Sequence, residues 1–168
     1  MPNKTTLKRA RQAKRAGRAP STQAGEFVRE EIDHIREGKH GARSTKQAIA
    51  IGLSKARRSG VDLPAPKKGT TSARTRRAAK QALSQGRSRR TRATSTARSR
   101  AATRALKRES RDVASKAQLS KQARTTARKR SASSRRASAR RAARTKGATL
   151  RRSAAKRAAA TRRRRLSA

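Results

Sequence analysis

The 168-residue sequence lacks cysteine, tryptophan and tyrosine, and Phe27 is its single aromatic residue. Without cysteine the chain has no disulfide and no thiol chemistry. Large apolar side chains are also scarce, because only 31% of the residues are hydrophobic and most of these are alanine. Ordering the backbone costs about 1 to 2 kcal/mol of free energy per residue, and the burial of alanine side chains offsets only a small part of this cost. We therefore expect the chain to be mostly disordered when it is free.

Long apolar runs are missing as well. No segment approaches the roughly 20 apolar residues of a membrane span, and the opening stretch MPNKTTLKRARQAKRAG has no apolar run typical of a secretory signal. The basic C-terminal half also lacks the Trp, Phe and Leu face with which a cationic helix enters a membrane interface. We expect a cytoplasmic protein that has no membrane partner.

Acidic residues are few, and basic residues dominate the composition. The chain has 51 Lys and Arg against 8 Asp and Glu, which gives a formal net charge of +43. Such a polycation is attracted to polyanions, and nucleic acid is the commonest of these in a cell. Arginine outnumbers lysine by 36 to 15, and its guanidinium group binds phosphate oxygens in a bidentate manner. The composition therefore indicates a protein that binds nucleic acid.

The charge is unevenly distributed, and this divides the chain into four segments. Residues 1–20 form a basic arm with seven basic and no acidic side chains. Residues 21–63 hold most of the acidic and large apolar residues and form the predicted folded module. Residues 64–70 are a linker rich in Pro and Gly, and residues 71–168 are a low-complexity basic tail of Ala, Arg, Ser and Thr.

The module has the pattern of two amphipathic helices, over residues 21–37 and 44–59. Large apolar residues recur at helical spacing in both segments, and Ser44 with Gln47 three residues later forms a capping box at the start of the second. We expect a small all-α helical hairpin. Its predicted core consists of Phe27, Val28, Ile32, Ile35, Ile49 and Leu53. A module of this size lies near the lower limit for independent folding, so we expect it to self-associate or to fold on a partner.

The first of these helices carries an acidic face on the side opposite to its apolar stripe. That face consists of Glu26, Glu30, Asp33 and Glu37. Three roles remain open for it: keeping the hairpin soluble, docking a basic segment of this chain or a neighbouring one, or repelling nucleic acid so that the hairpin stays free for protein contacts.

The basic tail has helix-forming residues but little that is able to form a core. Alanine and arginine favour helices, so we expect charge repulsion to keep the tail unfolded until phosphates neutralise it, at which point it becomes helical. The predicted phosphate contacts in the hairpin and the tail are Lys55, Arg57, Arg58, Arg76, Arg77, Arg89, Arg90, Arg128, Lys129, Arg130, Arg135, Arg136, Arg140, Arg141, Arg151, Arg152, Arg162, Arg163, Arg164 and Arg165.

Signals for catalysis are weak. Glu30 and His34 are spaced to share a cation on one helix face, but a solvated helix face explains them more simply. The sequence has no Gly-rich phosphate loop, no nucleophile elbow and no plausible triad. We expect no catalytic residue, no metal, no cofactor and no enzymatic activity. A helix-turn-helix reader is also disfavoured, because the second helix has no Asn or Gln side chain for base edges apart from Gln47, and the usual third supporting helix is not evident.

The run APSTQAGEFVREEIDHIREGKHGARSTKQAIAIGLSKARRSGVDLP, residues 19–64, resembles a poorly characterised family of small basic bacterial proteins labelled only as DNA-binding or of unknown function. Within it, KHGARSTKQAIAIGLSKARR carries most of the resemblance. The tail resembles bacterial linker-histone-like proteins in composition alone. The resemblance implies a bacterial nucleoid setting and assigns no role to any residue.

These observations together predict a sequence-nonspecific, histone-like, nucleoid-associated protein that neutralises phosphates and bridges or compacts DNA. The partners we expect are nucleic acid, with DNA preferred over RNA, and a second copy bound through the hairpin. The alternative is an RNA-binding protein, either ribosome-associated or an RNA chaperone. The missing aromatic residues argue against single-strand recognition by stacking, but they leave double-stranded RNA open.

Overall fold

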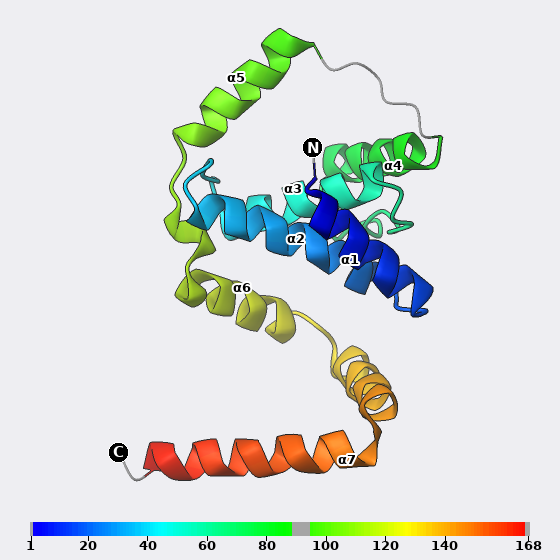
Figure 1. Cartoon of the computed structure of the whole chain (residues 1–168), viewed down its shortest axis with the longest axis vertical. Coiled ribbons are helices and arrows are strands. Elements are labelled where there is room, and N and C mark those ends of the chain that lie inside the picture. Colours follow the sequence, from blue (N-terminus) through cyan, green and yellow to red (C-terminus); the bar gives the residue numbers. More distant parts are fainter. Residues whose placement is uncertain (1, 89–94, 167–168) are drawn as a thin grey trace. The chain divides into compact units, whose positions relative to one another are not determined.

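The computed structural model describes residues 2–88 and 95–166, and helices make up nearly all of their regular structure (Figure 1). The chain divides into two compact units, Met1–Gln122 and Ala123–Ala168. The elements in chain order are α1 (Lys4–Arg15), α2 (Pro20–Arg36), α3 (Thr45–Arg58), α4 (Ala73–Arg87), α5 (Thr96–Lys107), the 3-10 helix η1 (Asp112–Ala114), α6 (Lys116–Arg128) and α7 (Ala132–Leu166).

Helices α2 and α3 form the hairpin that the sequence predicts. Pro20 occupies the first turn of α2, where its missing N–H has no helical partner to lose. Helix α3 begins at Ser44, whose Oγ accepts a hydrogen bond of 3.2 Å from the backbone N–H of Gln47. The Gln47 Oε1 atom in turn accepts one of 2.7 Å from the backbone N–H of Arg43. The predicted capping box is therefore present, with its return bond made one residue earlier than the usual pattern.

The core of the first unit consists of two apolar clusters. One contains Ala10, Ala24, Phe27, Ala56 and Val61, with Leu7, Leu53 and Leu63 partly buried against it. The other contains Ile32, Ile35, Ala42, Ala48 and Ala114, with Val28, Val113 and Leu119 partly buried against it. Five of the six predicted core residues therefore lie in these clusters. Ile49 is half-buried and belongs to neither of them.

Small residues on α3 explain why Ile49 lies outside the core. Ala48, Gly52 and Ala56 are buried, and their spacing of four residues places them on one face of α3. A Cβ atom built on Gly52 would lie 2.7 Å from the Cα atom of Val28 and 3.0 Å from the carbonyl oxygen of Phe27. The backbones of α2 and α3 therefore approach too closely for a side chain at this point. The predicted core named only the large residues on this side of the helix, whereas the small residues make the closest contact.

Substitution of Gly52 by alanine should destabilise the protein in spite of a better helix propensity. The new methyl group meets backbone rather than a flexible side chain, so α3 must move away from α2, at an expected cost of about 2 kcal/mol in the free energy of unfolding. Gly25→Ala on α2 is the matched control, because nothing lies within 4 Å of its Cβ position. It should stabilise the protein by about 0.5 to 1 kcal/mol. Urea unfolding of both variants measures the difference, and equal effects would contradict the close approach.

Segments outside the predicted module cover the hairpin. Helix α1 lies on α2 and buries Thr6 and Ala10, while α4 lies along α3 and buries Ala79 and Ala82 (Figure 1). Helix α4 begins at Ser72, whose Oγ accepts a hydrogen bond of 3.2 Å from the Thr75 N–H. The folded unit therefore includes the predicted arm and the first part of the predicted tail.

The segment around η1 closes the other end of the hairpin. Arg36 Nε donates to the carbonyl oxygen of Ala114 at 3.0 Å, and Thr45 Oγ1 donates to that of Val113 at 2.8 Å. The backbone N–H groups of Gly41 and Ala42 donate to the carbonyl oxygens of Leu106 and Ser110. The small module therefore obtains from its own chain the covering surface that a second copy was expected to supply. Self-association through the hairpin stays a prediction. The reason given for it, that the module is too small to fold without a partner, no longer applies.

The second unit is helical and has no core. Among its described residues, none is buried, and Leu150 is 60% exposed. Helix α7 is interrupted at Gly147, where φ is 64° and ψ is 170°. This backbone conformation favours glycine, and it separates two helical segments. In the part of the chain that the structure covers, no helix has the length and apolar character needed to cross a membrane.

The expectation that the free chain is mostly disordered is wrong. Helices run through the predicted arm and tail as well as the hairpin. Three causes act together: Ala, Arg and Lys are strong helix formers, serines cap α3 and α4, and the small faces of α1 and α4 find apolar surface on the hairpin. Charge repulsion is limited because the basic side chains point outward into water, where they are screened.

Candidate nucleic-acid interface and the buried acidic cluster

Two glutamates of α2 lie inside the first unit. Glu30 is 5% exposed and Glu31 is 1% exposed. The helical pattern places Glu30 on an exposed acidic face, but the structure places it under the N-terminus of α1. We use the name buried acidic cluster for Glu30, Glu31, His34, His40 and Lys55. Its members come from α2, from the loop after α2 and from α3.

Glu30 anchors the N-terminal arm. Its Oε1 atom accepts a hydrogen bond of 2.8 Å from the backbone N–H of Asn3, the residue that precedes the first turn of α1. A carboxylate at this position also interacts favourably with the positive end of the helix dipole. The same oxygen lies 3.7 Å from His34 Nε2. The carboxylate that seemed available for protein contact is thus engaged within the chain.

Glu31 joins α2 to α3 and to the intervening loop. Its Oε2 atom lies 2.5 Å from Lys55 Nζ, and its Oε1 atom lies 3.3 Å from His40 Nε2. Lys55 is one of the predicted phosphate contacts, but its ammonium group is occupied by this buried carboxylate and its side chain is only 20% exposed. Lys55 therefore has a structural partner and does not belong to the outer basic surface.

Burial changes the protonation of His34. Desolvation, followed by the nearby charges of Lys55 and Lys39, lowers the pKa of His34 below its usual value, and the carboxylates of Glu30 and Glu31 offset only part of this effect. The ring is therefore neutral at pH 7, with one nitrogen lone pair available.

Three further acidic residues, Asp33, Glu37 and Asp62, are also paired with cations. Lys39 Nζ lies 2.7 Å from Glu37 Oε2, and this hydrogen bond lowers the pKa of Glu37. Arg87 lies 2.7 Å from Asp62, and Arg36 lies 3.9 Å from Asp33. Such exposed pairs contribute little stability, but they cancel charge locally. Glu26, the fourth member of the predicted acidic face, is half-buried.

Arg57 is a second predicted phosphate contact that turns inward. It is 6% exposed, and its guanidinium group donates to the carbonyl oxygens of Leu63 and Pro64 at 3.1 Å each. Desolvation lowers the pKa of Arg57. Its role is to hold the linker that follows α3, so it is not available to bind a phosphate.

An exposed basic stripe on α1 was missing from the predicted phosphate contacts. Lys4, Lys8, Arg11 and Arg15 are all exposed, and their spacing of i, i+4, i+7 and i+11 places them on one face. The opposite face buries Thr6 and Ala10. The spacing of these basic residues was enough to predict the stripe. It was missed because the arm was interpreted as unstructured.

The second unit contains most of the predicted contacts. Residues 123–168 include 18 Lys and Arg and no Asp or Glu. The predicted contacts that are exposed, there and in the first unit, are Arg58, Arg77, Arg128, Lys129, Arg130, Arg135, Arg136, Arg140, Arg141, Arg151, Arg152, Arg162, Arg163 and Arg164. Arg76 is half-buried. Arg89, Arg90 and the side chain of Arg165 lie outside the described residues.

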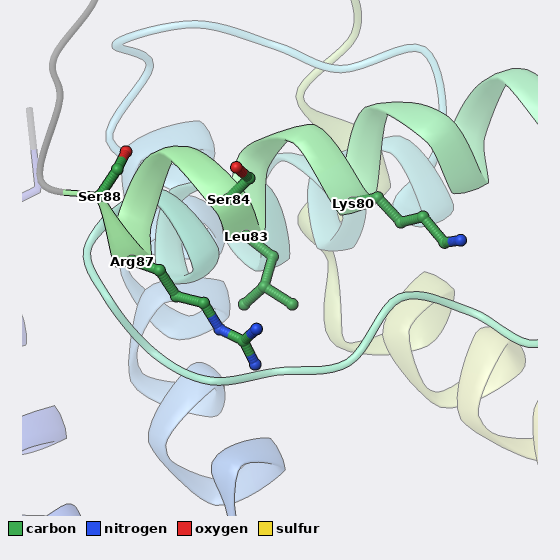
Figure 2. Close-up of a pocket in the computed structure, with 5 residues that line it drawn as sticks. All are labelled: Lys80, Leu83, Ser84, Arg87 and Ser88. Atoms are coloured by element: carbon green, nitrogen blue, oxygen red, sulfur yellow. The ribbon is translucent and has the colours of Figure 1, made fainter.

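A shallow hollow of about 550 Å³ lies along α4 (Figure 2). It is lined by Lys80, Leu83, Ser84, Arg87 and Ser88. Figure 2 shows the long side chains of Lys80 and Arg87 extending from the same helix on either side of Leu83. Arg87 is paired with Asp62, so Lys80 and the two serine hydroxyl groups are the lining groups that suit contact with an anion. The hollow is therefore part of the basic surface.

Gln47 is the single Asn or Gln residue of α3, and its side chain is used within the helix cap. The Oε1 atom of Gln47 accepts the hydrogen bond from the Arg43 N–H, so the side chain is committed to the helix cap. A bidentate contact with adenine needs both the oxygen and the nitrogen of the amide. Helix α3 therefore has no free Asn or Gln side chain for such a contact.

Residues 7–68 match the model of a family that is described only as of unknown function (DUF6496). The matched segment extends from α1 to the linker after α3, so it contains the whole buried acidic cluster and ends before α4. No curated protein and no solved structure matches the chain. The similarity therefore concerns the hairpin and its arm, and it brings no activity, ligand or partner.

Proposed function

We propose that this protein binds nucleic acid without sequence specificity, with duplex DNA as its preferred partner, and that it acts as a histone-like component of a bacterial nucleoid. The observation that carries the proposal is the charge of the second unit, where 18 basic residues stand without a single acidic one. Its described side chains are exposed or half-buried, so its cations are directed to solvent. The bacterial setting rests on the resemblance of residues 19–64 alone.

Composition supports binding to the phosphate backbone rather than to bases. Residues 123–168 contain no Asn, Gln, Asp or Glu, the side chains that pair with adenine or cytosine edges, and no aromatic residue for stacking. Arginine and lysine neutralise phosphates of any sequence. If all 18 charges met phosphates, this unit would neutralise about nine base pairs of duplex.

The first unit supports the same function in a different way. Its acidic residues are largely paired internally, which leaves the outer faces of α1 and α4 basic. It supplies a folded body to which the second unit is attached. We propose that a single chain contacts DNA through both units, at several points, and so bridges neighbouring DNA segments.

A competition titration distinguishes the proposal from the RNA-binding alternative. Full-length protein bound to a labelled DNA duplex is challenged with unlabelled DNA duplex of unrelated sequence, RNA duplex and single strands of equal length. We expect the unrelated DNA to compete as well as the labelled sequence, and single strands to compete least, because the chain has no stacking platform. Stronger competition by RNA duplex, maintained at high salt, would move the protein to the RNA-binding class.

A further inference from the structure

We propose that Glu31, His34 and His40 form a binding site for a divalent transition-metal ion, with Zn²⁺ as the expected occupant. The three residues lie in the buried acidic cluster, away from the basic surfaces assigned to nucleic acid. Each offers one ligand atom, and these atoms lie within 4.8 Å of one another. Two imidazoles and one carboxylate are a ligand set suited to zinc, and with three protein ligands the fourth position is left to water.

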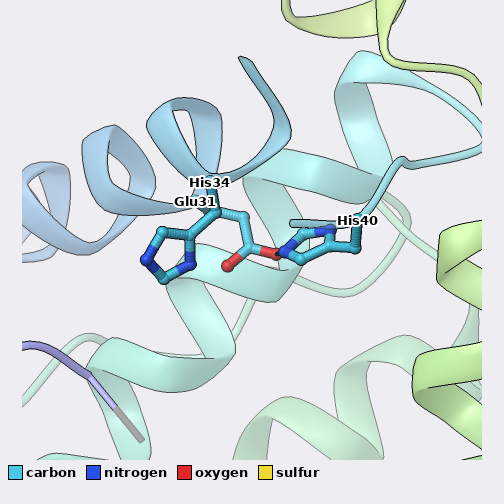
Figure 3. Close-up of side chains that lie close together, drawn as sticks. All are labelled: Glu31, His34 and His40. Carbon is cyan, nitrogen blue, oxygen red and sulfur yellow. Dashed lines mark ion pairs between the residues drawn. The ribbon is translucent and has the colours of Figure 1, made fainter. Parts of the chain in front are cut away.

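The geometry is close to that of a bound site. Zinc bonds of about 2.0 to 2.2 Å place neighbouring ligand atoms of a tetrahedral site roughly 3.4 Å apart. The distance from Glu31 Oε1 to His40 Nε2 is already 3.3 Å. Figure 3 shows the Glu31 carboxylate between the two imidazole rings. The His34 and His40 side chains are 15% and 14% exposed, so the site lies near the surface and an ion can reach it from solvent.

The Glu31 carboxylate has one oxygen without a hydrogen bond, on the side that faces His40. Lys55 occupies Oε2, but no described residue makes a hydrogen bond to Oε1, although the side chain is only 1% exposed. A buried charged oxygen without a partner is costly, and such atoms are rare in folded proteins. The His40 ring approaches Oε1 within ion-pair distance without hydrogen-bond geometry. A metal ion between them would satisfy both groups.

The contact made by the other ring nitrogen of His40 also favours a metal site. This nitrogen, Nδ1, lies 3.0 Å from the carbonyl oxygen of Gly41, an atom that only accepts hydrogen bonds. An Nδ1–H group directed at this carbonyl leaves Nε2, the nitrogen on the side of the Glu31 carboxylate, as the ring atom that can bind a metal ion. A backbone carbonyl that orients a histidine in this way is the usual outer-shell arrangement of metal ligands.

Glu30 extends the arrangement on the other side. Its Oε1 atom lies 3.7 Å from His34 Nε2, and its Oε2 atom is buried without a hydrogen bond from any described residue. The two carboxylates and the single ammonium group of Lys55 give the cluster a net charge of −1 when both rings are neutral. The cluster is therefore anionic in the middle of a strongly cationic protein.

A bound ion would act as a structural clamp. His34 belongs to α2, while His40 lies in the loop that leads to α3. Linking them through Glu31 would fix this loop, whose Gly41 and Ala42 N–H groups also hold the segment before η1. None of the three ligands is proposed to contact phosphates. The metal site and the nucleic-acid function therefore succeed or fail independently.

Titration of the full-length protein with ZnCl₂, followed by calorimetry, tests the site. We expect one ion per chain and a weaker affinity, by on the order of 100-fold, in His34→Gln and His40→Gln. Glu37→Gln is the matched control, because Glu37 is an exposed carboxylate on the same segment, paired with Lys39. It should bind zinc as the wild type does. Absence of zinc binding by the wild type, or wild-type affinity in both histidine variants, would overturn the proposal.

A second measurement on the unmodified chain avoids dependence on the folding of the variants. The histidine ring nitrogens are observed by ¹⁵N NMR before and after one equivalent of Zn²⁺. His34 and His40 are the only histidines, so the assignment is simple. We expect one nitrogen of each ring to shift as it becomes a metal ligand. Zinc binding that leaves either ring unchanged would place the ion elsewhere and refute this site.

Discussion

Replacing Arg135, Arg136, Arg140 and Arg152 together with glutamine lowers the affinity for duplex DNA by on the order of 1000-fold at about 100 mM salt. The slope of log Kobs against log salt becomes shallower by about three to four units, because each phosphate contact contributes about 0.9. All four side chains are exposed, and no acidic residue occurs in their unit. The loss should be equal for unrelated duplexes. Fluorescence anisotropy at several salt concentrations measures both quantities.

The matched control replaces the same four arginines with lysine. Lysine keeps the charge and loses only the bidentate geometry, so the salt slope should stay close to that of the wild type. Circular dichroism establishes that the helix content is equal in both variants. An unchanged slope in the glutamine variant would show that the second unit does not bind the phosphates, and a loss confined to one DNA sequence would indicate base readout instead.

Lys55→Met should destabilise the first unit by about 3 kcal/mol, because removal of one partner leaves the other charge of a buried ion pair uncompensated. Lys55 Nζ is the 2.5 Å partner of Glu31, which is 1% exposed. Met retains the apolar stem of lysine, so the lost charge dominates the effect. Urea unfolding in the presence of a chelator measures the change without a contribution from metal.

Two further variants isolate the ion pair. Lys46→Met lies on the same helix at an exposed position and should change stability by less than about 0.5 kcal/mol. Adding Glu31→Gln to Lys55→Met removes the buried charge and should restore part of the lost stability. DNA affinity should be nearly unchanged in Lys55→Met. A large loss of DNA affinity with normal stability would return Lys55 to the phosphate-binding surface, where the sequence analysis had placed it.

The hairpin and its cap were predictable because their signals are local. Apolar residues recur at helical spacing, and the bond between Gln47 and Ser44 spans three positions. The residues through which α3 contacts α2 most closely were harder to predict from the sequence. Core residues were chosen by the size of their apolar side chains as well as by their spacing. This choice favoured Ile49 over Gly52, where the two helices approach most closely. In a sequence, the only sign of a close approach between two backbones is a small residue. Small residues also occur at many positions where no such approach exists.

The buried acidic cluster could not be derived from the pattern along α2. Its contacts join residues that are 24 and 27 positions apart, Lys55 with Glu31 and Asn3 with Glu30. A helical wheel assigns Glu30 to the solvent side unless it is known that α1 lies over that side. The arm was taken as disordered because it is basic, although its helix has an apolar face at Leu7 and Ala10 that fits the hairpin. Composition was given more weight than periodicity, and this produced the error.

The acidic residues near the start of the chain therefore have a purpose within the fold. Glu30 and Glu31 anchor the arm, the loop and α3, while Glu37 and Asp62 pair with Lys39 and Arg87 at the surface. In a chain of net charge +43, internal pairing allows a folded unit to exist without reducing the basic charge of the second unit. This division between a folded body and an all-cationic extension underlies the proposed function.

The salt dependence of DNA binding by the full-length wild-type protein tests this function most directly. Two duplexes of equal length and unrelated sequence are titrated at about 50 and about 200 mM salt. We expect equal affinities for the two sequences and a loss of at least about 1000-fold between the two salt concentrations, as six or more phosphate contacts require. Affinity that is insensitive to salt, or that differs strongly between the sequences, would contradict binding through the cationic surface.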